Sequence, residues 1–213
     1  MAGKIFKSRE DAAFKLANKL KKYKDKPDTI IIALPRGGVV LGKILSKELD
    51  LPLDIIAPRK IKAPDNPELA IGAICEDKVF LNTNIVKMMG INSVYIEKAS
   101  NEEKKEEERR INAYRKNKSP LNLKGKIVIL VDDGIATGAT IRVAISAIKN
   151  HKVAKIVVAV PVASPDSIEA IKEEVKEVIC LQTPSEFMGI SQFYENFPQV
   201  EDKTVIKLLQ EKK

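Results

Sequence analysis

Residues 127–140 join a strand, a loop and the start of a helix in one short segment. Ile127–Val131 is apolar and rich in β-branched side chains, which is typical of a strand buried on both faces of a parallel sheet. Small residues follow, and apolar side chains return at helical spacing after Gly138. Strand-like and helix-like segments alternate in this way along most of the chain. The sequence therefore predicts an α/β fold, a mostly parallel sheet with helices on both faces.

The remaining elements follow the same alternation. Ser8 and Asp11 form a capping box that opens a first helix, and Ser164 with Pro165 opens a later one. Further strands are predicted at 29–34, 53–57, 71–75, 79–81, 155–160 and 178–181, and further helices at 39–49, 101–116 and 202–210. We expect one domain over residues 1–213, with an insertion at 60–120 that breaks the alternation.

The loop after residue 131 has the chemistry of a site for a phosphorylated sugar. Backbone N–H groups at the start of a helix, together with its dipole, bind phosphate, and Thr137 and Thr140 can add hydroxyl donors. Asp132 and Asp133 can accept hydrogen bonds from vicinal hydroxyls or organise a hydrated Mg²⁺. The Lys of a P-loop and the glycine spacing of a dinucleotide-binding loop are both missing.

The string from Val131 to Thr140 resembles the binding motif for phosphoribosyl pyrophosphate (PRPP) in type I phosphoribosyltransferases. The resemblance implies that the acidic pair holds the ribose 2′- and 3′-hydroxyls. It also implies that a set of loop residues binds the 5′-phosphate, namely Gly134, Ile135, Ala136, Thr137, Gly138, Ala139 and Thr140. The implied fold is a twisted, mostly parallel central sheet with a small hood subdomain.

A second loop, Pro35-Arg36-Gly37-Gly38, ends the strand at 29–34. Paired glycines let backbone approach a ligand closely, and Arg36 supplies several donors of fixed charge for phosphate oxygens. A plain turn would not need the arginine. The loop matches the one that binds pyrophosphate in the type I family, which implies a cis peptide bond between Pro35 and Arg36.

Basic residues also follow the strand at 53–57. Arg59 and Lys60 would lie at the same sheet edge as both loops, and the resemblance implies that they contact pyrophosphate. A solvated connection is the alternative. Residues 60–68, or the charged helix after them, could form a mobile lid. We interpret the charge run at 102–110 as a solvated helix face.

Residues 183–213 hold much of the aromatic content and are expected to contribute to the hood. Phe193 or Tyr194 could stack on an acceptor base, although packing within the subdomain would use the same side chains. His151, at a helix–strand junction, is interpreted as an exposed surface residue.

The implied enzyme is a phosphoribosyltransferase of the pentosyl glycosyltransferase class. It would move the 5-phosphoribosyl group from PRPP to a nitrogen nucleophile, such as a nucleobase in nucleotide salvage, and release pyrophosphate. Asp132, Asp133 and Arg36 would be the catalytic residues and Mg²⁺ the cofactor, held mainly by PRPP. The 6-oxopurine enzymes usually carry an acid where this chain has Ala136, which argues against hypoxanthine and guanine. The whole string, including residues 66–73, resembles a subgroup of predicted phosphoribosyltransferases in bacteria and archaea.

Composition limits the alternative functions of the chain. The net charge of +8 suits polyanionic ligands, but basic residues are interleaved with acids and aromatics make up only 5%, which argues against a basic RNA-binding protein. A non-catalytic sensor of PRPP or a nucleotide, or another phosphosugar enzyme, stays open. No apolar run approaches a membrane span, the first residues lack the core of a signal peptide, and Cys75 and Cys180 are interpreted as buried thiols. We expect a cytoplasmic protein, and the family implies a homodimer.

Overall fold

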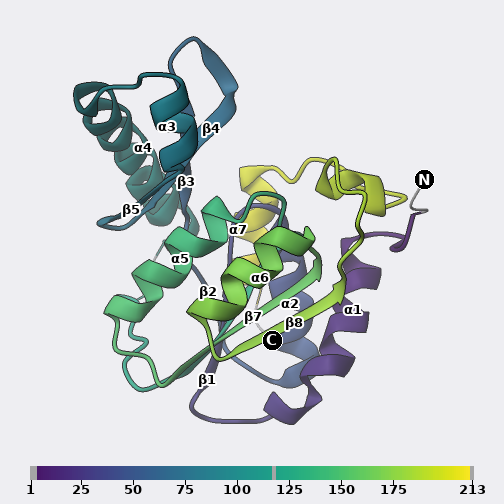
Figure 1. Cartoon of the computed structure of the whole chain (residues 1–213). Coiled ribbons are helices and arrows are strands. Elements are labelled where there is room, and N and C mark those ends of the chain that lie inside the picture. Colours follow the sequence, from purple (N-terminus) through teal and green to yellow (C-terminus); the bar gives the residue numbers. More distant parts are fainter. Residues whose placement is uncertain (1–3, 117–118, 212–213) are drawn as a thin grey trace.

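A five-stranded, fully parallel sheet forms the centre of the molecule (Figure 1). The computed structural model describes residues 4–116 and 119–211. The strand order is β2-β1-β6-β7-β8. The strands span Thr29–Ala33 (β1), Leu53–Ile55 (β2), Ile127–Val131 (β6), Lys155–Val162 (β7) and Glu177–Gln182 (β8). The parallel α/β architecture predicted from the sequence is confirmed.

Helices cover both faces of this sheet, as the apolar runs of the central strands require. Helices α1 (Arg9–Leu20) and α2 (Gly37–Leu49) pack on one face. Helices α5 (Ala139–Asn150) and α6 (Pro165–Glu174) pack on the other. Both predicted N-caps are present: Ser8 accepts from the Asp11 N–H and Ser164 from the Ser167 N–H. A short 3-10 turn, Lys21–Tyr23, follows α1.

Between β2 and β6 the chain leaves the core and builds a second sheet, which rises from it as a separate lobe (Figure 1). Its antiparallel strands are β3 (Arg59–Ala63), β4 (Asn66–Cys75) and β5 (Lys78–Leu81). Helices α3 (Thr83–Met88) and α4 (Ser93–Tyr114) complete this lobe, residues 59–114, which we call the arm. It packs on α5, where Arg142 lies 4.3 Å from the Phe80 ring centroid.

The candidate lid has regular secondary structure. Residues 60–68 form most of β3 and the start of β4, joined by a turn at Asp65, and their movement as a lid stays a prediction. Ile61 and Ala63 face the arm's core while Lys60 and Lys62 are exposed, so the segment alternates as a strand does. Residues 117 and 118 of the predicted insertion lie outside the described residues.

His151 is not a free surface residue. It is half-buried, and its Nε2 lies 3.0 Å from Glu76 Oε1 in the turn between β4 and β5. The single histidine of the chain therefore joins the end of α5 to the arm.

The C-terminal region divides into two parts. Residues 183–200, which we call the hood segment, contain a 3-10 turn at Ile190–Phe193 and pack on the N-terminal residues, with Phe6 bridged to Tyr194. Helix α7 (Asp202–Gln210) packs beside α2 and α4 instead. Residues 1–3, 212 and 213 lie outside the described residues. No helix in the described part of the chain could cross a membrane.

Candidate active site

The two predicted anion-binding loops follow neighbouring strands whose connections run to opposite faces of the central sheet. Strands β1 and β6 are neighbours, but the chain leaves β1 toward α2 on one face and β6 toward α5 on the other. This divergence opens a crevice at the carboxyl ends of the two strands, which is where open α/β sheets bind ligands. Both loops are thus brought together by topology, as the sequence predicted.

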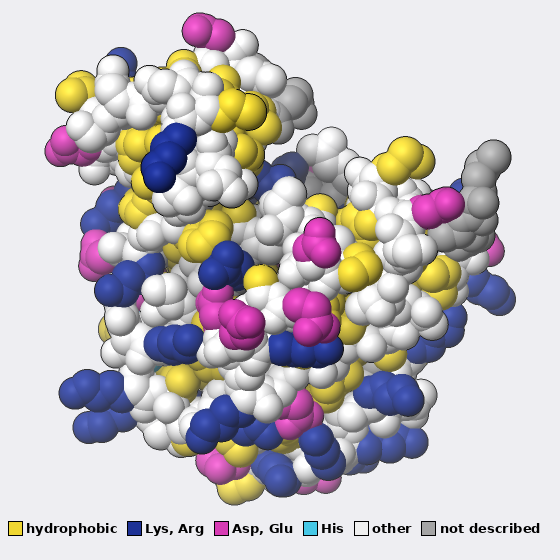
Figure 2. All heavy atoms as spheres, viewed as in Figure 1, with side chains coloured by type: hydrophobic (Ala, Val, Ile, Leu, Met, Phe, Trp, Pro, Cys, Tyr) yellow, Lys and Arg dark blue, Asp and Glu magenta, His cyan; other side chains and the backbone are white. Residues whose placement is uncertain are grey.

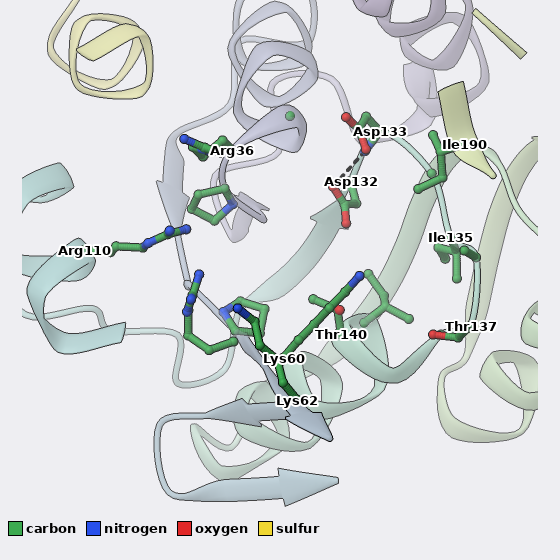
Figure 3. Close-up of a pocket in the computed structure, with 18 residues that line it drawn as sticks. Arg36, Lys60, Lys62, Arg110, Asp132, Asp133, Ile135, Thr137, Thr140 and Ile190 are labelled. Carbon is green, nitrogen blue, oxygen red and sulfur yellow. Dashed lines mark hydrogen bonds between the residues drawn. The ribbon is translucent and has the colours of Figure 1, made fainter. Parts of the chain in front are cut away.

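A pocket of about 450 Å³ occupies this crevice (Figure 3). The arm borders it on one side and the hood segment on another, and the surface is visibly hollowed between them (Figure 2). The predicted site residues that line it are Arg36, Gly37, Arg59, Lys60, Asp132, Asp133, Gly134, Ile135, Ala136, Thr137, Gly138 and Thr140. Gly38 and Ala139 lie just beside it, as the second residue of α2 and the first of α5.

The loop after β6 is anchored from β7 and α6. The Ile135 N–H donates to Val162 O at 2.9 Å, and the Ser164 N–H donates back to Ile135 O at 3.0 Å. The carbonyl of Ala136 accepts hydrogen bonds from the hydroxyls of Ser164 and Ser167, each at 2.7 Å. These two bonds hold the Ala136 carbonyl toward α6. The loop then enters α5 through Gly138, whose φ of 75° favours glycine. The free N–H groups at the start of α5 are therefore held in place before any ligand binds.

The acidic pair forms the floor of the pocket. Asp132 is partly exposed there, and its Oδ1 accepts a hydrogen bond from the Asp133 N–H at 2.9 Å. Asp133 is buried, and its Oδ2 lies 2.7 Å from Arg9 Nε. Desolvation raises the pKa of Asp132 well above its ordinary range, and the neighbouring Asp133 charge raises it further. Burial also raises the pKa of Asp133, with Arg9 opposing the rise.

Arg36 stands at the opposite wall. The peptide bond between Pro35 and Arg36 is cis, as the resemblance implied. Arg36 directly precedes α2, and its Nη1 lies 3.5 Å from Asp202 at the start of α7. Gly38 lies against the end of β6, where a Cβ would be 2.8 Å from Val131 O. The absence of a side chain at this position therefore lets the two loops approach each other.

The phosphoribosyl transferase domain family matches residues 3–198 of the chain. This chain belongs to that family. The identification agrees with the geometry above: an anchored loop at a helix N-terminus, an acidic floor, and an arginine loop from the neighbouring strand. The match covers the core, the arm and most of the hood segment.

Relatives of this phosphoribosyltransferase domain include a protein from two strains of Mycobacterium tuberculosis that carries a provisional phosphoribosyl transferase name. It is 37% identical over 207 residues, which is 97% of this chain and 46% of that protein. The chain thus spans about half the length of these curated relatives. A uracil phosphoribosyltransferase from Aquifex aeolicus is 41% identical over 56 residues, which is 26% of this chain and 27% of that protein.

Among solved structures, the protein TT1426 from Thermus thermophilus is similar over almost the whole chain. Its TM-score is 0.79 at 33% identity, covering 96% of this chain and 97% of that one. A hypoxanthine phosphoribosyltransferase from Staphylococcus aureus has a TM-score of 0.50 at 15% identity over 84% of this chain and 74% of that one, which shows the shared fold alone.

The pocket also contains residues that the sequence did not single out. Lys62 and Arg110 reach it from the arm, alongside Lys60, so that cations gather on the side facing the acidic pair (Figure 3). Lys62 shares its strand face with Lys60, a two-residue period that would have been visible had 59–63 been recognised as a strand. Arg110 was hidden within a charge run, so the interpretation of that run as wholly solvated is wrong.

The hood segment supplies Ile190 to the pocket. Phe193 and Tyr194, the predicted base-stacking residues, are 0% and 2% exposed and do not line it. They pack with Phe6 instead, and the Tyr194 hydroxyl donates to Asp133 O at 2.7 Å. Because neither ring face is open to a ligand, this placement gives no support to the stacking role.

Proposed function

We propose that this protein transfers the 5-phosphoribosyl group of PRPP to a nitrogen nucleophile of the nucleobase class and releases pyrophosphate. The observation that carries the proposal is the order of groups across one pocket. An anchored phosphate loop lies on one side, two carboxylates form the floor, and Arg36 from the neighbouring loop and Arg110 from the arm lie across the pocket from Thr137 (Figure 3). A sugar with a phosphate at one end and a pyrophosphate at the other matches that order.

Each group would have one task in binding. The N–H groups and hydroxyls of residues 137–140 would hold the 5′-phosphate, and the acidic pair would receive the ribose hydroxyls. Arg36, the amides at the start of α2, Arg59 and Lys60 would hold the pyrophosphate. Arginine suits this end because its planar fork can bind two phosphate oxygens at once.

The residues present fit Mg²⁺ as a companion of the substrate. The described residues contain no group of three or more His, Cys, Asp or Glu side chains arranged around a metal site. Mg²⁺ is commonly held by one or two carboxylates together with substrate phosphates, and Asp132 is the carboxylate that is open to the pocket. The ion would neutralise charge on the pyrophosphate.

In the reaction, the C1–O bond to pyrophosphate would break largely before the bond to nitrogen forms, so positive charge develops on the ribose. Arg36 and the neighbouring amides would stabilise the departing pyrophosphate, and the carboxylate floor would offset charge on the ring. The arm and hood segment border the pocket and would limit access of water, which otherwise hydrolyses the activated sugar.

Titration calorimetry with PRPP and Mg²⁺ tests the donor half of the proposal, using the wild type and the Asp132→Asn/Asp133→Asn variant. We expect binding that requires Mg²⁺ and is lost in the variant. A screen of nucleobases for pyrophosphate release then tests the transfer. No binding at millimolar PRPP would overturn the proposal.

Two alternatives have distinct outcomes in the same experiments. Binding of PRPP without pyrophosphate release from any base would favour a sensor on the same fold. Salt-dependent RNA binding that survives the double substitution would favour an RNA-binding protein; the face shown in Figure 2, however, has Lys and Arg interleaved with Asp and Glu. The homodimer and the cytoplasmic location stay predictions.

A further inference from the structure

Arg9 is a buried arginine in an electrostatically unfavourable place. It is the first residue of α1 and only 7% exposed. A cation at a helix N-terminus opposes the helix dipole, and burying its charge requires close partners. The other buried residues of α1 are all apolar. The position therefore depends on contacts outside the helix.

Those contacts come from two different parts of the molecule. Arg9 Nε donates to Asp133 Oδ2 at 2.7 Å, and Nη1 donates to Pro198 O in the hood segment, also at 2.7 Å. The guanidinium carbon lies 3.6 Å from the centre of the Phe197 ring. One guanidinium thus binds Asp133 through one edge, and the hood segment through another edge and one face.

The same contact gives the two aspartates different surroundings. The Asp133 carboxylate is packed between Arg9 and the α2 loop, where a Cβ on Gly37 would be 1.9 Å from Oδ2. Asp132 is partly exposed to the pocket, and its one described hydrogen bond comes from the Asp133 N–H. In Figure 3 the Asp132 side chain points into the pocket, while Asp133 lies behind it toward the loop that carries Arg36.

The hood segment is tied to Asp133 a second time, because the Tyr194 hydroxyl donates to its carbonyl at 2.7 Å. A continuous path therefore runs from Asp132 through the Asp133 N–H and carboxylate to Arg9, and from there to Pro198 and Phe197. A ligand that fixes Asp132 would restrict every later member of this path.

We propose that Arg9 is a positioning residue that holds Asp133 behind Asp132, so that Asp132 is the carboxylate that contacts the ribose, and that Arg9 links occupancy of this site to the order of the hood segment. The inference rests on the proposed PRPP-dependent function and refines its acidic pair.

Binding of PRPP with Mg²⁺ tests the first half. Arg9→Gln leaves a buried carboxylate without its partner, so we expect affinity to fall on the order of tenfold. Arg9→Gln/Asp133→Asn removes both charges and keeps an amide pair. This double variant should therefore bind PRPP at least about threefold more tightly than Arg9→Gln alone, because residues in direct contact are typically coupled to this extent. If the double variant binds no better than Arg9→Gln, Asp133 contacts the ligand itself and the inference is wrong.

Arg9→Lys tests the link to the hood segment. Lysine keeps the charge beside Asp133, but its single nitrogen cannot span the carboxylate and Pro198 O together. Hydrogen exchange of residues 190–198, measured with and without PRPP and Mg²⁺, should slow on binding in the wild type and not in Arg9→Lys. Equal slowing in both proteins would show that Arg9 is merely structural.

The same variants titrated with ribose 5-phosphate separate the two proposals. Wild-type binding of ribose 5-phosphate but not of PRPP would overturn the proposed donor and still allow the Arg9 comparisons to be made. Binding of both ligands with no effect of Arg9 substitution would overturn the positioning role and leave the proposed function intact.

Discussion

Gly134 lies directly against Ile190: a Cβ on Gly134 would be 2.7 Å from Ile190 Cγ2 and 3.1 Å from Val162 Cγ1. The phosphate loop and the hood segment therefore touch at a position that has no room for a side chain. We expect Gly134→Ala to displace the hood segment and to lower the free energy of unfolding by about 1–3 kcal/mol, the usual cost of overpacking. Thermal or denaturant unfolding measures the change.

Gly189 supplies the matched control. It precedes Ile190, its backbone is extended with a φ of 178°, and no atom lies within 4 Å of the place where a Cβ would stand. Gly189→Ala should change the free energy of unfolding by roughly 0.5 kcal/mol or less. Similar losses at both glycines would show that the close contact at Gly134 is not what matters.

Arg110 and Arg109 form a natural pair for testing the arm's part in anion binding. Both donate to Glu106, but Arg110 lines the pocket and Arg109 does not. We expect Arg110→Gln to weaken PRPP binding by roughly tenfold, since a charged hydrogen bond is lost, and Arg109→Gln to leave it within about twofold. Calorimetry with PRPP and with ribose 5-phosphate gives the comparison. An equal effect of Arg110→Gln on both ligands would place this side chain away from the pyrophosphate.

Asp132 should make the folded state less stable at neutral pH. Its pKa is higher in the folded chain than in the unfolded one, so the free energy of unfolding falls as pH rises from the ordinary carboxyl range to the raised value. Neutral pH lies above the ordinary carboxyl range, so this loss is already present there. We therefore expect Asp132→Asn to abolish PRPP binding and to raise Tm. The rise should be about 2–4 °C for each kcal/mol that is added to the free energy of unfolding.

Asp133→Asn should act in the opposite direction. Burial raises the pKa of Asp133 as well, but this carboxylate is paired, and the substitution leaves the buried Arg9 charge without its partner. Differential scanning calorimetry of both variants at neutral pH distinguishes the two aspartates. A lower Tm for Asp132→Asn would contradict the expectation.

Glu177 gives the fold a dependence on acid pH far from the pocket. Partial burial opposes its ionisation, but hydrogen bonds from Lys155, Lys22 and Tyr23 lower its pKa from 4.5 to about 2. A lowered carboxyl pKa stabilises the fold above the unfolded value, and the stabilisation is lost as pH falls through the folded value. Glu177→Gln should cost about 1–2 kcal/mol at pH 7. Urea unfolding should show this difference closing between pH 4.5 and 2; a difference that persists below that range would refute the assignment.

Local sequence patterns predicted the elements that position the pocket. Each of these patterns determines the conformation of only a few neighbouring residues. The structure has the strand predicted at Ile127–Val131, the helices predicted from the capping serines at 8 and 164, and the loop predicted from the paired glycines after Arg36. The arm was harder to predict. Its first strand is short, polar and rich in lysine, and only Ile61 and Ala63 face the arm's core. That composition is shared by strands and by solvated connections.

Contacts between distant parts of the chain could not be predicted in this way. Arg9 and Asp133 are 124 positions apart, and nothing near either residue indicates the other. The same holds for Gly134 and Ile190. Phe193 and Tyr194 show a related limit, because an aromatic residue in a hood can face a ligand or the interior, and composition does not decide between the two.

The arm interrupts the core once, between β2 and β6, so every residue that it contributes to the pocket comes from one continuous stretch of chain. The phosphate loop, the acidic pair and Arg36 all come from outside that stretch. The two halves of the pocket could therefore change independently during evolution. An exchange of residues 59–114 between relatives would alter the cations that the arm contributes and leave the phosphate loop and the acidic pair intact. The same boundary offers protein engineers a place to graft a different arm onto this core.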